Sequence, residues 1–272
     1  MTTTTFFITG ASRGFGKSLA IAFAEKFIET SSEFILIARD KNELEETKRN
    51  VFAVSPFSRI ILAPFFDLSN LDEIESGFYQ AAALIQQDEK SSSIDNTRKR
   101  KLVLINNAGS GNPVANLNDL KDLISIRSAL DLNITSCVWL TAVFLRYAQE
   151  SNCTEAVVVN VSSLAAVQPF ASMGIYSIGK AARDMLHRVV AEENKDGTLQ
   201  VKTLNYAPGP MDTKLQDEMR SSPNMNISIK SFFNDMAEKN TWVKIDDSAQ
   251  KLARLIWEDK FTSGSHVDFY DI

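Results

Sequence analysis

A tyrosine and a lysine four residues apart are the side chains of this sequence best suited to proton transfer. Tyr176 and Lys180 project from one face if their segment is helical, and Ser163 precedes the tyrosine by thirteen residues. A tyrosine hydroxyl has a reference pKa of about 10, but a nearby ammonium group favours the phenolate and moves this pKa toward neutrality. Ser163 could orient and polarise a carbonyl group. Together the three residues predict proton donation to a carbonyl oxygen, although a Tyr–Lys pair alone also occurs by chance on ordinary helix surfaces.

A glycine-rich turn lies between the first apolar run and the first helix-like stretch. Its residues are Gly10, Ala11, Ser12, Arg13, Gly14, Phe15 and Gly16. Glycines permit a tight turn and let the backbone approach a pyrophosphate, whose charge is favoured by the free N–H groups of a helix N-terminus. The spacing G-x-x-x-G-x-G differs from the general dinucleotide fingerprint, and structural loops carry similar glycines. The position between strand and helix favours dinucleotide binding.

The end of the second predicted strand indicates which dinucleotide is bound. Folds that bind NAD usually place an acid there, about 20 residues after the glycines, but this sequence has Ala38 followed by Arg39. Arg39 and Arg13 could bind the 2′-phosphate of NADP through charge-assisted hydrogen bonds. Asp40 could offset Arg39 in part, and two surface arginines remain the alternative interpretation. The expected cofactor is therefore NADP or NADPH.

Two further strand ends carry candidate cofactor residues. Asp67 and Leu68 end the third predicted strand, where a carboxylate could accept a hydrogen bond from an adenine amino group. Asn107, Ala108 and Gly109 follow the fourth strand, and their alternative role is that of a simple turn. Open α/β sheets bind ligands at the carboxyl ends of their strands, so a binding role is favoured for both segments.

Apolar runs alternate with longer helix-like stretches along the chain. The predicted strands are Phe6–Thr9, Phe34–Ala38, Ile60–Phe66, Leu102–Asn106, Ala156–Val161 and Val201–Tyr206. The predicted helices are Lys17–Phe27, Leu71–Gln87, Leu120–Glu150 and Ile175–Glu193. Strands that are apolar throughout are covered on both faces, and their alternation with helices indicates βαβ units. The prediction is an α/β protein with a single Rossmann-type domain, in which helices flank a doubly wound parallel sheet.

Composition excludes several classes of protein. The net charge is −5 and the isoelectric point about 5.2, which argues against a nucleic-acid-binding protein. No apolar run approaches the roughly 18 residues of a membrane span, and Met1–Thr5 does not resemble the start of a secretory signal. Two histidines and two cysteines do not make a metal site. We expect a cytoplasmic protein without metal, membrane or nucleic-acid partners.

These motifs together resemble the short-chain dehydrogenase/reductase family over nearly the whole chain. The resemblance implies a parallel sheet of about seven strands and a catalytic group in which Asn133 joins Ser163, Tyr176 and Lys180. Asn133 would support a water molecule linked to Lys180, and Lys180 would also hold the nicotinamide ribose. The Pro-Gly turn of the family is matched by Pro208 and Gly209, with Pro208 expected at the cofactor, and Met211, Asp212 and Thr213 would lie along the nicotinamide. The helices around 130–147 and 181–190 form a dimer interface in this family, which implies a homodimer.

Four stretches, 162–170, 179–185, 204–210 and 263–271, resemble a pterin-reducing branch of that family. This resemblance implies that Asp268 anchors the pterin ring and that Leu164 and Gly209 line the same pocket. It further implies reduction of side-chain ketones of a pterin, as in the last steps of tetrahydrobiopterin formation. A solvated Asp on a final strand is the alternative for Asp268. For the whole protein, the alternatives are a general NADPH carbonyl reductase, a sugar or steroid dehydrogenase, and a non-catalytic dinucleotide sensor.

Other segments give weaker indications. Residues 88–101 are polar and are expected to form an exposed loop, whose basic end at Arg98–Lys101 could instead bind an anion. Residues 212–246 are expected to contribute a substrate lid. His187 is interpreted as a packing or interface residue, and His266 as a surface residue of the last strand that could touch substrate.

Overall fold

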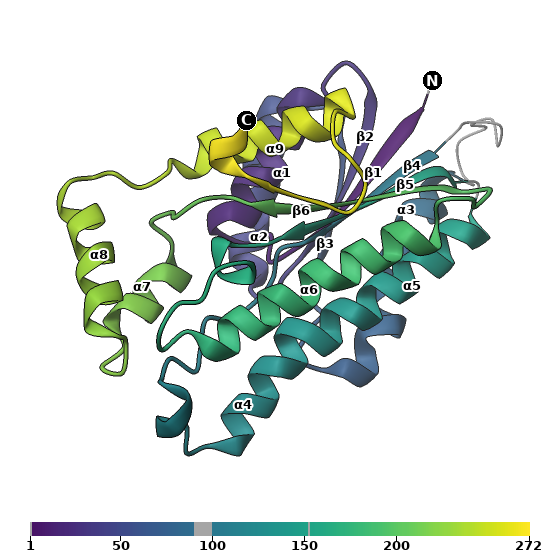
Figure 1. The fold of residues 1–272 in the computed structure, drawn as a ribbon. Helices are drawn as coiled ribbons and strands as arrows, with labels where there is room; N and C mark the ends of the chain where they lie inside the picture. The colour runs from purple at the N-terminus through teal and green to yellow at the C-terminus, as the bar shows by residue number, and fades with distance from the viewer. Residues whose placement is uncertain (1, 90–99, 152) are drawn as a thin grey trace.

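A seven-stranded parallel sheet forms the centre of the protein (Figure 1), in a computed structural model that describes residues 2–89, 100–151 and 153–272. The strand order is β3-β2-β1-β4-β5-β6-β7. The strands are β1 (Thr3–Thr9), β2 (Ser31–Ile37), β3 (Arg59–Ala63), β4 (Arg100–Asn106), β5 (Cys153–Val161), β6 (Gln200–Ala207) and β7 (Ser265–Asp268). The predicted fold class is confirmed. The order reverses between β1 and β4, which places a ligand-binding crevice at the carboxyl ends of these strands.

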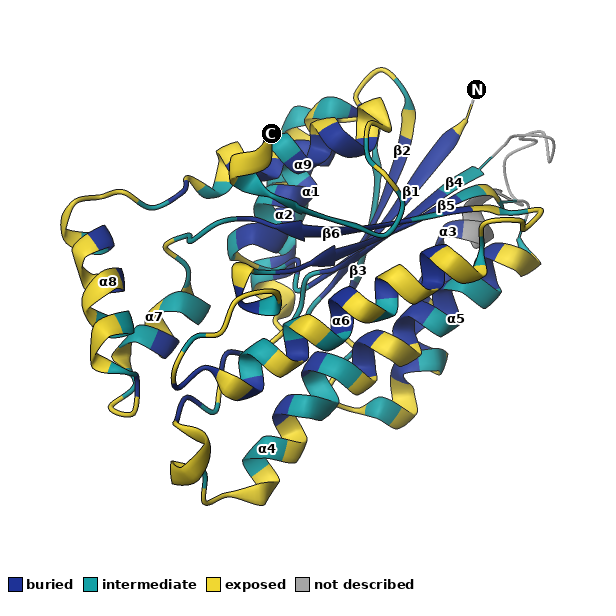
Figure 2. Cartoon of the chain, viewed as in Figure 1, coloured by how far each residue is buried: buried dark blue, intermediate teal, exposed yellow. Residues whose placement is uncertain are grey.

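Helices cover both faces of the sheet. One face carries α1 (Gly14–Lys26), α2 (Lys41–Val54) and α9 (Ile245–Glu258). The other face carries α3 (Ile74–Glu89), α4 (Leu123–Leu130), α5 (Ser136–Glu150) and α6 (Gly174–Glu193). Helices α7 (Lys214–Ser221) and α8 (Ile227–Glu238) extend beyond the end of β6 in Figure 1. Figure 2 shows a buried sheet and helices whose exposed residues face outward.

Alternate residues of each strand enter two separate cores. In β1, Phe6 and Ile8 pack with α1 and α9, whereas Phe7 packs with Phe78 of α3 and Phe144 of α5. Successive side chains of a strand point to opposite faces, so a strand covered on both sides has to be apolar throughout. This requirement explains the continuous apolar runs of the sequence.

Several element boundaries differ from the prediction. Strand β1 begins at Thr3 rather than Phe6, because its three threonines are buried and the Thr5 hydroxyl donates to Glu33 at 2.7 Å. Strand β3 ends at Ala63, before Pro64, which has no N–H to donate to the sheet. The predicted helix 120–150 begins at Leu123 and contains a π-helical turn at Asp131–Thr135. Helices α2, α7, α8 and α9 were not predicted, although α9 buries Ala249, Leu252 and Ile256 at helical spacing.

Two further expectations concern exposed or apolar stretches. Asp88 and Glu89 belong to α3, while Arg100 and Lys101 begin β4, so the predicted loop 88–101 is too long at both ends. Its remaining residues lie outside the described ranges.

Among the described residues, the continuous helical stretch Leu123–Glu150 is long and apolar enough to cross a membrane. Its apolar residues Leu140, Val143 and Phe144 are buried in the core, which accounts for that composition.

Candidate active site

A cavity of about 1400 Å³ runs along the carboxyl ends of the strands. The predicted site residues that line it are Gly10, Ser12, Arg13, Gly14, Phe15, Arg39, Asp40, Asp67, Leu68, Asn107, Ala108, Gly109, Ser163, Leu164, Tyr176, Lys180, Pro208, Gly209, Met211, Thr213 and Asp268. One continuous space therefore joins the glycine turn to the Tyr–Lys pair and to the last strand.

The glycine turn has the close packing that a pyrophosphate site requires. Gly10 and Gly14 have φ values of +66° and +54°, which side-chain-bearing residues rarely adopt. A Cβ atom on Gly16 would lie 2.2 Å from the Gly10 carbonyl oxygen. Arg13 precedes α1 without a capping side-chain bond, so first-turn N–H groups remain available to an anion. These residues fit a dinucleotide.

The end of β4 is tied to the glycine turn through β1. The Asn107 side chain donates to the carbonyl oxygens of Thr9 at 2.9 Å and Gly10 at 3.3 Å. The Thr9 hydroxyl accepts from the backbone N–H groups of Asn107 and Ala108, at 2.9 and 3.0 Å. The sequence reasoning missed this threonine, and no local signal marks it, because the contact joins residues about a hundred positions apart. The predicted turn therefore has a supporting role beside the cofactor residues.

Two acidic residues lie near Arg13 and Arg39. The Asp40 carboxylate caps α2 by accepting from the Glu43 N–H at 3.0 Å. The Glu43 carboxylate lies 3.7 Å from Arg13, at an exposed position where such a pair is weak. Both arginines are exposed and line the cavity. Asp67 also lines it, with one carboxylate oxygen accepting from Ser69 N–H at 2.9 Å.

The chemical residues meet where β5 ends and α6 begins. The Ser163 hydroxyl accepts from the Ala165 N–H at 3.2 Å and caps a short 3₁₀ turn. The Lys180 ammonium nitrogen lies 5.5 Å from the centre of the Tyr176 ring and donates to the Val161 carbonyl at 2.5 Å. The fold thus brings the serine, tyrosine and lysine together in the lining of the cavity.

Burial controls the protonation of this pair. It raises the pKa of Tyr176 above its ordinary value of 10, while interactions with Ser163 and Arg183 oppose the rise. Burial also lowers the pKa of Lys180 to about 7, and the Arg183 charge acts in the same direction. The expectation that Lys180 moves the tyrosine pKa toward neutrality is therefore wrong, because the cost of burying a phenolate exceeds the opposing effects of Ser163 and Arg183. Tyr176 is a neutral hydroxyl at pH 7.

Two successive residues of α6 join the Tyr–Lys helix to the strand ends. The Arg183 side chain is buried and donates to the carbonyl oxygens of Asn106 and, at 3.0 Å, Ala108. The Asp184 carboxylate accepts from Ser162 at 2.5 Å and from His266 at 2.6 Å. Sequence analysis missed both residues. Their signal was a pair of opposite charges on the inward face of a helix, one turn after Lys180.

The last strand contributes Asp268 and His266. The Asp268 carboxylate caps a 3₁₀ turn, Phe269–Asp271, by accepting from the Tyr270 N–H at 3.0 Å. Asp268 lines the cavity, so it is not simply a solvated strand residue. His266 also lines the cavity and is paired with Asp184. His187 is fully buried on α6, where its Nδ1 atom lies 2.7 Å from the Arg183 carbonyl oxygen, so it is a packing residue.

Four predicted site residues lie outside the cavity lining. Ala11 is fully buried, and Gly16 packs against the Gly10 carbonyl. Asp212 is exposed. The Asn133 amide lies in the π-helical turn, where it accepts from the Ser110 N–H at 2.8 Å and donates to the Ser110 carbonyl at 2.9 Å. Asn133 therefore braces the loop after β4 from behind the cavity.

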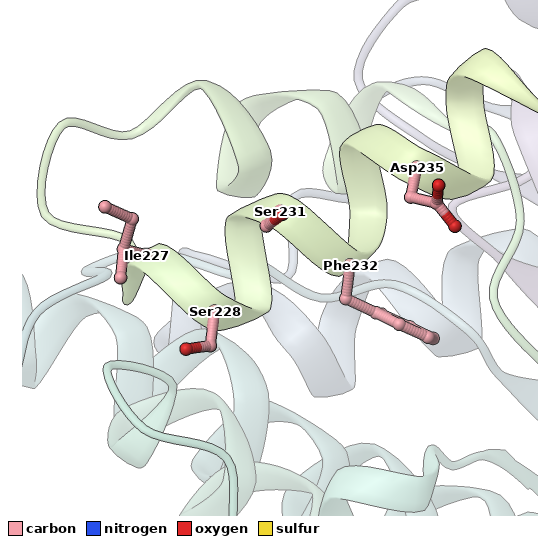
Figure 3. Close-up of a pocket in the computed structure, with 5 residues that line it drawn as sticks. All are labelled: Ile227, Ser228, Ser231, Phe232 and Asp235. Carbon is pink, nitrogen blue, oxygen red and sulfur yellow. The ribbon is translucent and has the colours of Figure 1, made fainter.

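Helices α7 and α8 form an apolar wall of the cavity. Met219, Phe232, Phe233 and Met236 line it, and the sequence reasoning found no pattern in this region. Their helical spacing was the available signal. Figure 3 shows a second hollow on α8, lined by Ile227, Ser228, Ser231, Phe232 and Asp235. Phe232 lines both hollows, so α8 contacts the cavity on one side and is open on another.

Known proteins resemble the chain over nearly its full length. The sequence profile described as short chain dehydrogenase matches residues 4–224. Sepiapterin reductase of Rattus norvegicus is 37% identical over 266 residues, covering 97% of this chain and 95% of that protein. A benzil reductase ((S)-benzoin forming) of Bacillus subtilis (strain 168) is 30% identical, covering 98% of this chain and 97% of that protein.

Solved structures share the fold. A 7α-hydroxysteroid dehydrogenase, solved with NADH and 7-oxo glycochenodeoxycholic acid, superposes with a TM-score of 0.76 and 20% identity. The match covers 98% of this chain and 93% of that one. The resemblance to a pterin-reducing branch is confirmed by the similarity to sepiapterin reductase. With its glycine turn, its Ser–Tyr–Lys group and these relatives, the chain belongs to the short-chain dehydrogenase/reductase family of oxidoreductases.

Proposed function

We propose that the protein is an NADPH-dependent reductase of side-chain ketones of pterins, such as sepiapterin and 6-pyruvoyl-tetrahydropterin. The observation that carries this proposal is the single cavity, whose lining includes Arg13 and Arg39, Tyr176 and Asp268. The similarity to sepiapterin reductase over 97% of the chain supports the same substrate class. Its products would belong to the last steps of tetrahydrobiopterin formation.

The choice of NADPH rests on the charges around β2. Ala38 offers no carboxylate to a ribose hydroxyl, and the neighbouring Asp40 is occupied as the cap of α2. Arg39 and Arg13 are exposed along the cavity and can reach a 2′-phosphate with charge-assisted hydrogen bonds. NADH lacks this phosphate and would gain nothing from the two guanidinium groups.

The chemical step follows from the protonation states of the site. The bound dinucleotide supplies a hydride to the carbonyl carbon. Tyr176 donates its hydroxyl proton to the carbonyl oxygen, and its raised pKa keeps that proton in place at neutral pH. The Ser163 hydroxyl orients the carbonyl. Lys180, close to the tyrosine ring, stabilises the phenolate that forms as the proton leaves.

Asp268 is the proposed anchor for the pterin ring. One of its oxygens accepts from the Tyr270 N–H, and an ionised carboxylate retains further acceptor positions. These positions can accept two hydrogen bonds from the amino-pyrimidine edge of a pterin. A pterin ring anchored at Asp268 would hold its side-chain ketone near Tyr176 and raise the effective concentration of the ketone there.

A homodimer is part of the proposal. Val138 and Trp139 of α5 and Ile178, Met185 and Val189 of α6 are large apolar residues that remain exposed on the helix faces away from the sheet. The three α6 residues are seven and four positions apart and share one helical face. A second copy of the chain would cover this apolar surface.

The decisive assay follows the absorbance of reduced nicotinamide after NADPH is mixed with protein and sepiapterin, with NADH as the comparison. Rapid turnover selective for NADPH is expected. Asp268→Asn should raise the KM for sepiapterin more than the KM for a simple diketone, because only the pterin needs the carboxylate. Equal losses on both substrates would contradict the anchoring role.

A general diketone reductase is the second candidate function. The 30% identity to the Bacillus subtilis benzil reductase favours it specifically. Reduction of benzil by NADPH, without turnover of sepiapterin, would establish this candidate and exclude the pterin.

A further inference from the structure

A buried carboxylate connects the chemical residues to the last strand. Asp184 of α6 accepts hydrogen bonds from Ser162 at 2.5 Å, from Asn160 at 2.9 Å and from His266 Nδ1 at 2.6 Å. Asn160 belongs to the end of β5, and Ser162 follows that strand immediately before Ser163. The His266 side chain comes from β7 and is 23% exposed, whereas that of Asp184 is 10% exposed. One carboxylate therefore holds β5, α6 and β7 together.

The proposed mechanism does not use this carboxylate, although its neighbours contribute to the site. Asp184 lies four residues after Lys180, so the two side chains share a helical face. His266 lies two residues before Asp268, so their side chains share a face of β7. Any displacement of His266 relative to α6 would move the proposed anchor relative to the proposed proton donor.

Strand β7 is restrained by its pairing with β6 and by the packing of Val267 against the core. It is four residues long, lies at the edge of the sheet and pairs with β6 alone. Its residues are all partly exposed. A short edge strand of this kind needs side-chain contacts to hold a substrate group at a fixed position, because small displacements at a site reduce binding and rate.

We propose that Asp184 and His266 form an ion pair that positions β7, and through it Asp268, against the catalytic helix, so that pterin binding weakens as the histidine loses its proton. The inference rests on the proposed function of Asp268. His266 is thus a positioning residue for the pterin subsite, and its effect depends on pH.

The charges around His266 favour its protonated form. The hydrogen bond and charge of Asp184 raise the pKa of His266 above its ordinary value of 6.5, and Asp268 and Asp271 act in the same direction, whereas burial opposes them. The neighbouring strand β6 presents the uncharged Asn205 beside His266.

The nearby cations make other contacts. Arg183 donates to backbone carbonyls at the end of β4, and Lys180 donates to the Val161 carbonyl. Lys202 of β6 pairs with Asp259. Lys251 of α9 donates to the Phe269 carbonyl at 2.8 Å and to the Ile272 carbonyl. The acidic groups therefore determine the direction of the shift.

The sign of the effect follows from this raised pKa. Below about pH 6.5 His266 is a cation in both folded and unfolded chains, and the ion pair contributes fully. As the pH rises through the pKa of the folded state, the proton is lost and the pair becomes a weaker neutral hydrogen bond. The KM for a pterin should therefore rise with pH over the neutral range.

The first test measures KM for sepiapterin and for a simple diketone from about pH 6 to about pH 8.5, a range that brackets histidine titration. Lys180 also titrates near neutrality, but it affects both substrates, so the ratio of the two KM values isolates the anchor. In the wild type this ratio should rise about three- to tenfold with pH, the size expected when a charge-assisted hydrogen bond becomes a neutral one.

Two variants separate the effect of the His266 charge from the effect of its hydrogen bond to Asp184. His266→Asn places an amide donor near the Nδ1 position but cannot titrate, so the KM ratio should become independent of pH. His266→Ala removes the donor as well and should raise the ratio at every pH, with the asparagine variant lying between alanine and the wild type at low pH. A wild-type ratio that stays flat, or a slope that persists in His266→Asn, would overturn the proposal.

A second measurement needs no substrate. Hydrogen exchange should show protection factors for the amides of Ser265–Asp268 that fall as the pH rises in the wild type and stay constant in His266→Asn. If protection falls but sepiapterin is not reduced, the ion pair stands and the pterin assignment fails. If protection is independent of pH, the ion pair is overturned whatever the substrate.

Discussion

Tyr176 and Lys180 show how burial changes the chemistry expected from residue types alone. The sequence predicted that the Lys180 ammonium lowers the pKa of Tyr176. In the structure, burial raises the pKa of Tyr176 and lowers that of Lys180 to about 7. For a reduction, this arrangement is favourable, because the group that must donate a proton holds it at neutral pH. The lysine then acts on the phenolate as it forms, rather than on the resting hydroxyl.

Tyr176→Phe should bind NADPH with nearly unchanged affinity and lose about 10²- to 10⁴-fold in kcat, the range that general acid catalysis supplies. Phenylalanine keeps the ring that packs above Lys180 but has no proton to give. Cofactor binding is measured by nicotinamide fluorescence and turnover by absorbance. Wild-type turnover in this variant would exclude the proton-donor role.

Arg39→Ala should raise the KM for NADPH about 10- to 100-fold, which corresponds to loss of a hydrogen bond to a charged group, and leave that for NADH nearly unchanged. Arg49→Ala is the matched control, because Arg49 is exposed on α2 and does not line the cavity. Equal effects of Arg39→Ala on both cofactors would remove the assignment of the 2′-phosphate.

Helix α6 organises the site because its inward face carries four polar residues over about two turns. Tyr176 and Lys180 face the cavity, and Arg183 and Asp184 follow on the same side, bonded to the ends of β4, β5 and β7. Buried charges are costly unless they are paired and hydrogen-bonded, and these contacts offset that cost. The chemical residues are therefore positioned against three strands by a single helix.

Gly16→Ala should lower the free energy of unfolding by about 1–3 kcal/mol and abolish measurable NADPH binding, because its Cβ would meet the Gly10 carbonyl at 2.2 Å. Gly174→Ala is the control, since a Cβ at this α6 position meets no atom within 4 Å. Denaturant unfolding and cofactor titration measure both effects. An unchanged affinity in Gly16→Ala would show that α1 can shift without damage to the turn.

The molecule as a whole has one sheet with an apolar core on each face, and an apolar outer surface on α5 and α6. The cores account for stability, but they leave Trp139, Met185 and Val189 exposed. Exposed apolar groups of this extent on adjacent helices mark protein–protein interfaces. A homodimer through these helices would leave the cavity open, because the cavity lies at the carboxyl ends of the strands.

Met185→Glu should weaken the proposed dimer about 100-fold or more, because an unpaired carboxylate would enter its apolar interface. Sedimentation at micromolar concentration distinguishes the two states. Phe57→Glu is the control, because Phe57 is 98% exposed and lies on the turn between α2 and β3. This turn is not part of α5 or α6. A wild-type protein that sediments as a monomer would contradict the dimer.

The amino-acid sequence alone determined the fold class and identified many residues of the cavity lining, although not its apolar wall on α7 and α8. Strands buried on both faces must be apolar throughout, and a turn that approaches a phosphate must be rich in glycine, so both features are visible in local sequence. The Tyr–Lys spacing of four residues is equally local.

Only the tertiary structure decided which polar residues work together and in which protonation states. Asp184 and His266 are 82 residues apart, and their contact exists because β7 returns beside β6 at the end of the chain. The pKa values of Tyr176 and Lys180 depend on how much water the assembled sheet and helices exclude. Burial and long-range contact are properties of the folded chain, and no local pattern of residues encodes them.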